Sequence, residues 1–99
     1  MVILDKKTQP SKAPTGLAIS LSAGTAALTW TAGDATETGY DVQRKASSDG
    51  TYASIGTPTA ESYNDSTIAK GNSYWYRVFA TNANGTSVGS NVIQITYSN

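Results

Sequence analysis

The segment SYWYRVFATN, residues 73–82, decides how this chain is expected to fold. Its side chains alternate with a period of two, which is the side-chain repeat of a β-strand. The face expected to point inward carries two tyrosines and two small apolar residues, Tyr74, Tyr76, Val78 and Ala80. The opposite face carries Trp75, Arg77, Phe79 and Thr81. Turn sequences precede and follow the segment, so it is predicted to be a central strand of a sheet that packs on a second sheet.

Shorter segments on both sides show the same alternation and are separated by turns. Strands are predicted at residues 17–21, 26–31, 40–46, 52–56 and 62–65. A last strand is predicted within residues 87–98, with Ile93, Ile95 and Tyr97 facing inward. Gly24 and the pair Asp49-Gly50 mark hairpin turns. No segment shows the period of a helix, so the chain is predicted to be an all-β sandwich of seven short strands.

Composition narrows the possible function classes. The 99 residues suffice for one domain, and seven Lys and Arg balance seven Asp and Glu, so no net charge attracts nucleic acid or an anionic membrane. The chain has no Cys and no His, which excludes disulfides and zinc–thiolate sites and removes the commonest general base. We expect residues 1–13, with their charges and Pro10, to be a linker or a flexible N-terminal arm, and residues 14–99 to be the domain. No apolar run is long enough for a membrane span or a signal peptide.

Six carboxylates fall in predicted turns or on exposed strand faces: Asp34, Glu37, Asp41, Asp49, Glu61 and Asp65. None is placed as one of a pair in an apolar cleft, where burial would raise a pKa and prepare a general acid. We therefore expect solvated surface charges, and for Asp65 a further role in bonding backbone amides of the turn before Ile68. The sequence predicts no catalytic residue, no cofactor and no metal site.

A set of residues spread over the chain carries a family pattern. They are Pro14, Leu17, Leu28-Thr-Trp30, Gly39-Tyr40-Asp-Val42, Ser62-Tyr63-Asn-Asp65, Ile68, Gly71, Tyr74-Trp-Tyr76-Arg77-Val78, Ala80, Asn82, Gly85, Ser87 and Ser90. In this register the chain resembles the fibronectin type III module over residues 13–97, in particular the version found in secreted bacterial polysaccharide-degrading enzymes. The resemblance implies an immunoglobulin-like, seven-stranded Greek-key sandwich with three strands packed on four. It also implies one bead of a multidomain chain.

Structural roles are predicted for five residues of the interior: Trp30, Tyr40, Tyr74, Tyr76 and Val78. Tyr74 begins a strand just after the crossover at residues 68–71, so it suits a tyrosine corner, in which the phenol bonds a backbone group a few residues upstream. Trp30 and Tyr76 stand where an immunoglobulin domain would have its disulfide. Burial of one such large ring removes enough area from water to contribute about 4 to 6 kcal/mol.

Trp75, Arg77 and Phe79 are the candidate contact residues. Alternation places them on the outward face, with Arg44 or Lys45 of the neighbouring strand within reach of the indole. An exposed indole beside polar groups suits stacking on a sugar ring or on a partner chain. The alternative is a structural one, in which Trp75 lies flat on the sheet and is covered by the side chains of Arg77 and Arg44.

The leading functional hypothesis is a non-catalytic spacer module in an extracellular, secreted or cell-surface multidomain protein, with a bacterial glycoside hydrolase as the parent that the resemblance suggests. The alternative is a binding or adhesion module that uses the face around Trp75 or the loops at residues 32–38 and 82–87. The expected partners are neighbouring domains of the same chain, with a polysaccharide or a protein partner left open. Nucleic acid and membrane are not expected, and a monomer is.

Overall fold

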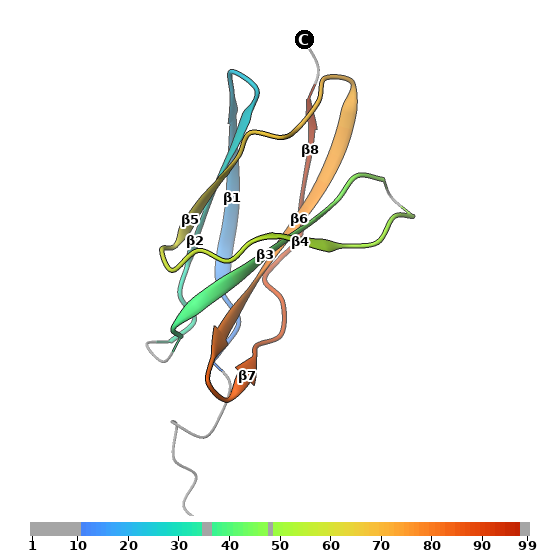
Figure 1. Ribbon diagram of the computed structural model, residues 1–99. Coiled ribbons are helices and arrows are strands. Elements are labelled where there is room, and N and C mark those ends of the chain that lie inside the picture. The colour runs from blue at the N-terminus through green and yellow to red at the C-terminus, as the bar shows by residue number, and fades with distance from the viewer. Residues whose placement is uncertain (1–10, 35–36, 48, 98–99) are drawn as a thin grey trace, which may run out of the picture.

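A computed structural model describes residues 11–34, 37–47 and 49–97 as two antiparallel sheets packed face to face (Figure 1). The first sheet has three strands in the order β1 (Thr15–Ser22), β2 (Thr25–Thr31) and β5 (Ser62–Asp65). The second has the order β4 (Ala53–Gly56), β3 (Gly39–Lys45) and β6 (Asn72–Asn82), followed by β7 (Gly85–Thr86) and β8 (Ile93–Tyr97), which both pair with β6. The predicted all-β sandwich is confirmed. Within the described residues there is no helix of the length and hydropathy that a membrane span requires.

Strand β6 forms the centre of the larger sheet, as its alternation predicted. It pairs with β3 from Trp75 to Thr81, with Val42 opposite Val78, and buried residues alternate with partly exposed ones along its length. Its inward side chains meet those of the smaller sheet in one core. The buried apolar residues of this core are Leu17, Ala26, Leu28, Trp30, Tyr40, Val42, Ile68, Tyr74, Tyr76, Val78 and Ala80.

The last strand predicted within residues 87–98 is confirmed as β8, whose Ile93, Ile95 and Tyr97 pack against the core, but it fills only the second half of that range. The last strand is interrupted: β7 and β8 pair with the two ends of β6, and residues 87–92 between them are not extended as a strand. Two serines complete the edge of β6 there, because the Ser87 Oγ accepts from Ala80 N and the Ser90 Oγ accepts from Val78 N, each at 2.8 to 2.9 Å. Side-chain hydroxyls thus replace backbone carbonyls, a substitution that alternation does not reveal.

Two further features join the sheets and close their ends. The β1–β2 hairpin turns through Ala23 and Gly24, both with positive φ (52° and 81°), the geometry of the tight turn that suits twisted strands. The Asn91 side-chain amide lies between the sheets' edges, where Oδ1 accepts from Leu17 N at 3.0 Å and Nδ2 donates to Leu17 O at 3.1 Å. This amide satisfies part of the free edge of β1, which would otherwise present unpaired backbone groups.

The predicted boundary at residue 13 stays a prediction. Residues 1–10 lie outside the described residues, so their assignment as a linker or arm has no structural counterpart. Residues 11–13 do lie within the described part, where Ser11 is 5% exposed.

Candidate functional site

The three candidate contact residues of β6 lie in a row of alternating rings and cations on the outer face of the larger sheet. We define the cation–aromatic row as Trp75, Lys45, Tyr52, Arg77 and Phe79. The Lys45 Nζ lies 5.7 Å from the Trp75 ring centroid and 5.0 Å from that of Tyr52. The Arg77 guanidinium lies 3.9 Å from the Tyr52 centroid and 4.9 Å from that of Phe79. All five residues are partly exposed, and each cation lies within the range of an attractive cation–π contact with two rings.

Neighbouring polar side chains hold this row in place. Arg77 Nε donates to Gln43 Oε1 at 2.8 Å, and Gln43 Nε2 donates in turn to Asp41 Oδ2 at 2.9 Å. Gly89 packs on the rim of the Phe79 ring, since a Cβ added there would stand 3.3 Å from two ring carbons. The row therefore has fixed geometry, and the indole of Trp75 has a lysine over it. A cation therefore covers Trp75, as the structural alternative supposed, but that cation is Lys45, and Arg77 lies over Tyr52 and Phe79 instead.

Arg44 or Lys45 was expected within reach of the Trp75 indole; Lys45 lies there, and the expected covering of Trp75 by Arg44 is wrong. Arg44 points between the sheets, because alternate residues of a strand share a face and the buried Tyr40 and Val42 lie four and two residues before it in β3. Its guanidinium lies 5.0 Å from the centroid of the inward Tyr74 ring. The alternation of β3 already contained this signal, since a residue two after Val42 must share its face. Lys45 is the cation that covers Trp75.

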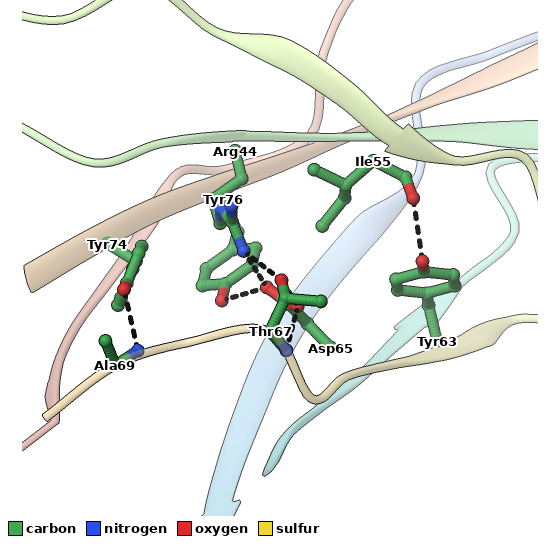
Figure 2. A network of polar contacts seen from close by, with 8 residues as sticks. All are labelled: Arg44, Ile55, Tyr63, Asp65, Thr67, Ala69, Tyr74 and Tyr76. Carbon is green, nitrogen blue, oxygen red and sulfur yellow. Dashed lines mark hydrogen bonds and ion pairs between the residues drawn. The ribbon is translucent and has the colours of Figure 1, made fainter. Parts of the chain in front are cut away.

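Asp65 connects the two sheets, and the expectation that it is a solvated carboxylate is wrong. It is 3% exposed, at the end of β5, rather than solvated (Figure 2). Its Oδ2 accepts from Arg44 Nη1 and from Tyr76 OH, both at 2.7 Å, and both of those residues belong to the opposite sheet. Its Oδ1 accepts from Thr67 N at 3.0 Å and from Thr67 Oγ1 at 2.6 Å. The backbone bond confirms the predicted role in the turn before Ile68.

Electrostatics make this carboxylate a permanent anion near neutral pH. Burial alone would raise the pKa of Asp65, but the hydrogen bonds from Thr67, Tyr76 and Arg44 outweigh burial and lower that pKa. The pKa of Arg44 is raised, because the attraction of Asp65 exceeds the opposing effect of burial. Burial and the bond to Asp65 also raise the pKa of the Tyr76 phenol. The pKa shifts of Asp65 and Arg44 both favour the charged forms, so these two residues form an ion pair inside the folded protein.

Two tyrosines add polar links beside the Asp65 cluster (Figure 2). Tyr74 OH accepts from Ala69 N at 2.8 Å, five residues upstream, which confirms the predicted tyrosine corner. Tyr63 of β5 donates to Ile55 O of β4 at 2.7 Å and so joins the two sheets at their far edge. The Tyr63 ring lies directly on Gly56, where an added Cβ would overlap it. The sequence analysis did not identify the link of Tyr63 to β4.

The opposite end of the interior is aromatic. Trp30 and Tyr40 are 5% and 2% exposed and pack edge to face, with ring centroids 5.2 Å apart and an interplanar angle of 70°. Within the described residues, the buried atoms Trp30 Nε1, Tyr40 OH and Glu37 Oε2 have no hydrogen-bond partner. Burial, with a smaller effect of the Glu37 charge, raises the pKa of Tyr40 to about 12. All five residues with predicted structural roles are therefore buried, including Tyr76 and Val78, which are fully enclosed.

The carboxylates other than Asp65 lie apart or bond to neighbouring polar side chains in the part of the chain that the structure describes. No three acidic side chains gather there in a way that would hold a metal ion. Asp41 accepts from Ser54 Oγ at 2.5 Å as well as from Gln43, and the exposed Asp49 accepts from Ser47 Oγ at 3.1 Å. Asp41 and Asp49 thus bond to side chains of their own or neighbouring strands and turns.

Comparisons with known proteins agree with this geometry. Residues 12–96 match the fibronectin type III domain family. Among solved structures, a Fn3-like protein from Clostridium thermocellum is 33% identical, with a TM-score of 0.78 over 90% of this chain and 95% of that chain. A structure of domains from titin is 25% identical, with a TM-score of 0.79 over 90% of this chain and 32% of that chain. The twitchin kinase region from C. elegans is 15% identical, with a TM-score of 0.81 over 92% and 17%.

The chain therefore spans about a third of the titin structure (32%) and less of the twitchin structure (17%). None of the curated proteins compared with the chain matches it.

Proposed function

This chain belongs to the fibronectin type III family, and we propose that it serves as a non-catalytic spacer module in an extracellular multidomain protein. The observation that carries the proposal is the use of the buried ion pair. Asp65 accepts from Arg44 and from Tyr76 of the opposite sheet, and the pKa of its carboxyl is lowered rather than raised toward that of a general acid. A module of this kind supplies a stiff body and leaves the chemistry to other domains.

The course of the chain through the sandwich supports this role. Strand β1 begins at one end of the sandwich and β8 finishes at the other (Figure 1). A body that the chain enters at one pole and leaves at the other holds apart the domains joined to its two ends. The titin and twitchin structures, which are much longer than this chain, give examples of such modules beside other domains.

We further propose a bacterial polysaccharide-degrading enzyme as the parent protein. The family pattern of residues 13–97 and the 33% identity to the Fn3-like protein from Clostridium thermocellum support this context. In such an enzyme the spacer would keep a substrate-binding module and a catalytic domain at a set separation. Binding of the first module to a polymer then raises the effective concentration of the second near its substrate.

A replacement experiment in the parent protein tests the proposal. We expect exchange of residues 14–97 for a flexible Gly/Ser segment to leave hydrolysis of soluble oligosaccharides unchanged and to slow hydrolysis of insoluble polymer. A different fibronectin type III domain in the same place, the matched control, should restore the rate. Loss of activity on soluble substrate, or hydrolysis by the isolated domain, would contradict the spacer role.

A second candidate function is binding through the cation–aromatic row. Its support is the partial exposure of Trp75, Tyr52 and Phe79 on one sheet face. If the row binds a sugar, titration with soluble oligosaccharides changes the fluorescence of Trp75, and a Trp75→Ala variant abolishes the change. An unchanged spectrum across the titration counts against this candidate.

A further inference from the structure

Residues 11–13, which precede the first strand, lie against two loops at one pole of the sandwich. Ser11 is 5% exposed, and its Oγ accepts from Asn82 Nδ2 at 3.2 Å, across 71 residues of sequence. The next residue, Lys12, donates its backbone N–H to Asp34 Oδ2 at 3.1 Å. Pro14 follows and is fully buried. The chain is therefore held from residue 11 onward, before the sheet begins.

Gly33 of the β2–β3 loop makes room for this segment. A Cβ at position 33 would overlap the Ala13 carbonyl oxygen and would stand 2.8 Å from the Lys12 carbonyl oxygen. The obstacle on both sides is backbone, which cannot rotate away as a side chain can. Gly33 does not have a positive φ, so the close approach of residues 12 and 13 is the reason that no side chain fits here.

We propose that residues 11–13 form a docked entry segment, seated on Gly33, Asp34 and Asn82, that fixes the direction in which the preceding part of the chain joins the domain. This inference rests on the proposed spacer function and deepens it. A spacer with a free joint sets only a maximum separation between its neighbours, whereas one with a docked entry also sets the orientation of the preceding neighbour. The occupant of this pole is thus the protein's own upstream chain.

The docked entry segment also limits how a partner could bind the two loops that the sequence analysis proposed as binding loops. Residues 32–38 supply Gly33 and Asp34 to the seat, and residues 82–87 supply Asn82. A partner that binds these loops must therefore approach beside the entry segment or displace it.

Backbone dynamics test the docked entry on the 99-residue chain itself. NMR relaxation should give order parameters for the amides of Lys12 and Ala13 near the value of about 0.85 that rigid backbone shows. In Gly33→Ala they should fall below about 0.6, the range of flexible segments, while the strands stay rigid. Gly39→Ala is the matched control, because its Cβ would meet only ordinary contacts at the same pole, the nearest at 3.4 Å to Thr81 Oγ1. Order parameters below about 0.6 at Lys12 and Ala13 in the unaltered chain overturn the inference.

A second readout measures direction and serves if Gly33→Ala does not fold. The chain has no Cys, so a nitroxide placed on Lys12→Cys is the only label, and the contact of residue 12 with Asp34 is kept because it uses the backbone N–H. The nitroxide should broaden the NMR signals of amides in the β2–β3 loop and the β6–β7 turn. When Asp34→Ala is added to the labelled protein, this broadening should become weaker and extend over more residues. An identical pattern in both proteins overturns the inference. Either negative result leaves the spacer proposal intact, because that proposal requires a folded body and is tested in the parent protein.

Discussion

The two ends of the interior between the sheets are held together by different means. At one end, the Asp65 carboxylate accepts four hydrogen bonds, from Arg44, Tyr76 and Thr67. At the other end, Trp30 and Tyr40 pack edge to face, and their buried polar atoms have no hydrogen-bond partner in the described part of the chain. The first end is held by hydrogen bonds to a buried charge, and the stability of the second end comes from the apolar area that its rings bury.

Because of this difference, we expect substitutions at the two ends to lower the stability of the protein for different reasons. A polar cluster around a buried charge loses much when one member is removed, because the others are left unpaired in a poorly solvated place. An aromatic contact loses stability in proportion to the area and volume removed. A buried hydroxyl or N–H without a partner costs stability rather than adding to it, so its removal is not destabilising. Substitutions matched between the two ends test this view.

Trp30→Ala should have the largest effect, a loss of about 4 kcal/mol in the free energy of unfolding, because it removes the largest side chain of the aromatic end. Trp75→Ala, on the outer face of the sheet, is the control and should cost about 1 kcal/mol. Urea unfolding followed by circular dichroism measures both. A cost under about 1 kcal/mol for Trp30→Ala would contradict the assignment of this ring to the core.

Asp65→Ala should cost about 3 kcal/mol, because Arg44 and the Tyr76 hydroxyl lose their acceptor inside the molecule. Asp49→Ala removes an exposed carboxylate and should change stability by less than about 0.5 kcal/mol. Equal effects in the same urea experiment would mean that the ion pair is not needed to hold the sheets.

Acid should weaken the polar end more gently than the substitution does, since protonation leaves the Asp65 side chain in place. The pKa of Asp65 is lower in the folded protein than the value of about 3.9 in the unfolded chain, so the unfolded state binds the proton first. The contribution is therefore complete above about pH 4 and is lost as the pH falls through the folded pKa. Asp65→Asn does not titrate, so the stability difference between the two proteins should shrink over that range. A difference constant from about pH 7 to about pH 2 would refute this.

Removal of a single hydroxyl gives the smallest and sharpest comparison. Tyr76→Phe deletes a donor to a buried carboxylate and should cost about 1.5 to 2 kcal/mol. Tyr40→Phe deletes a buried hydroxyl that has no partner among the described residues, so it should leave the free energy of unfolding unchanged or raise it by up to about 1 kcal/mol. Equal costs in urea unfolding would mean that the two ends do not differ as described.

Sequence reasoning succeeded where a local pattern carries the information. The alternation of residues 73–82 identified the central strand and its buried face, and Tyr74 next to the crossover identified the tyrosine corner. The same reasoning failed for Asp65. A carboxylate near a turn is usually solvated, and no residue close to Asp65 in the sequence indicates that a cation is buried beside it. The inward direction of Arg44 could have been predicted, because Arg44 lies two residues after the buried Val42 in β3.

By itself, the sequence determined where most of the strands lie and which side of β6 is buried, because a period of two is a property of neighbouring residues. The tertiary structure alone decided which groups meet across the interior. Arg44 and Asp65 lie 21 residues apart on opposite sheets, and Ser11 and Asn82 lie 71 apart at one pole. Their contacts depend on how the two sheets stack and where the loops end, and that is set by the packing of the whole core rather than by any stretch of chain.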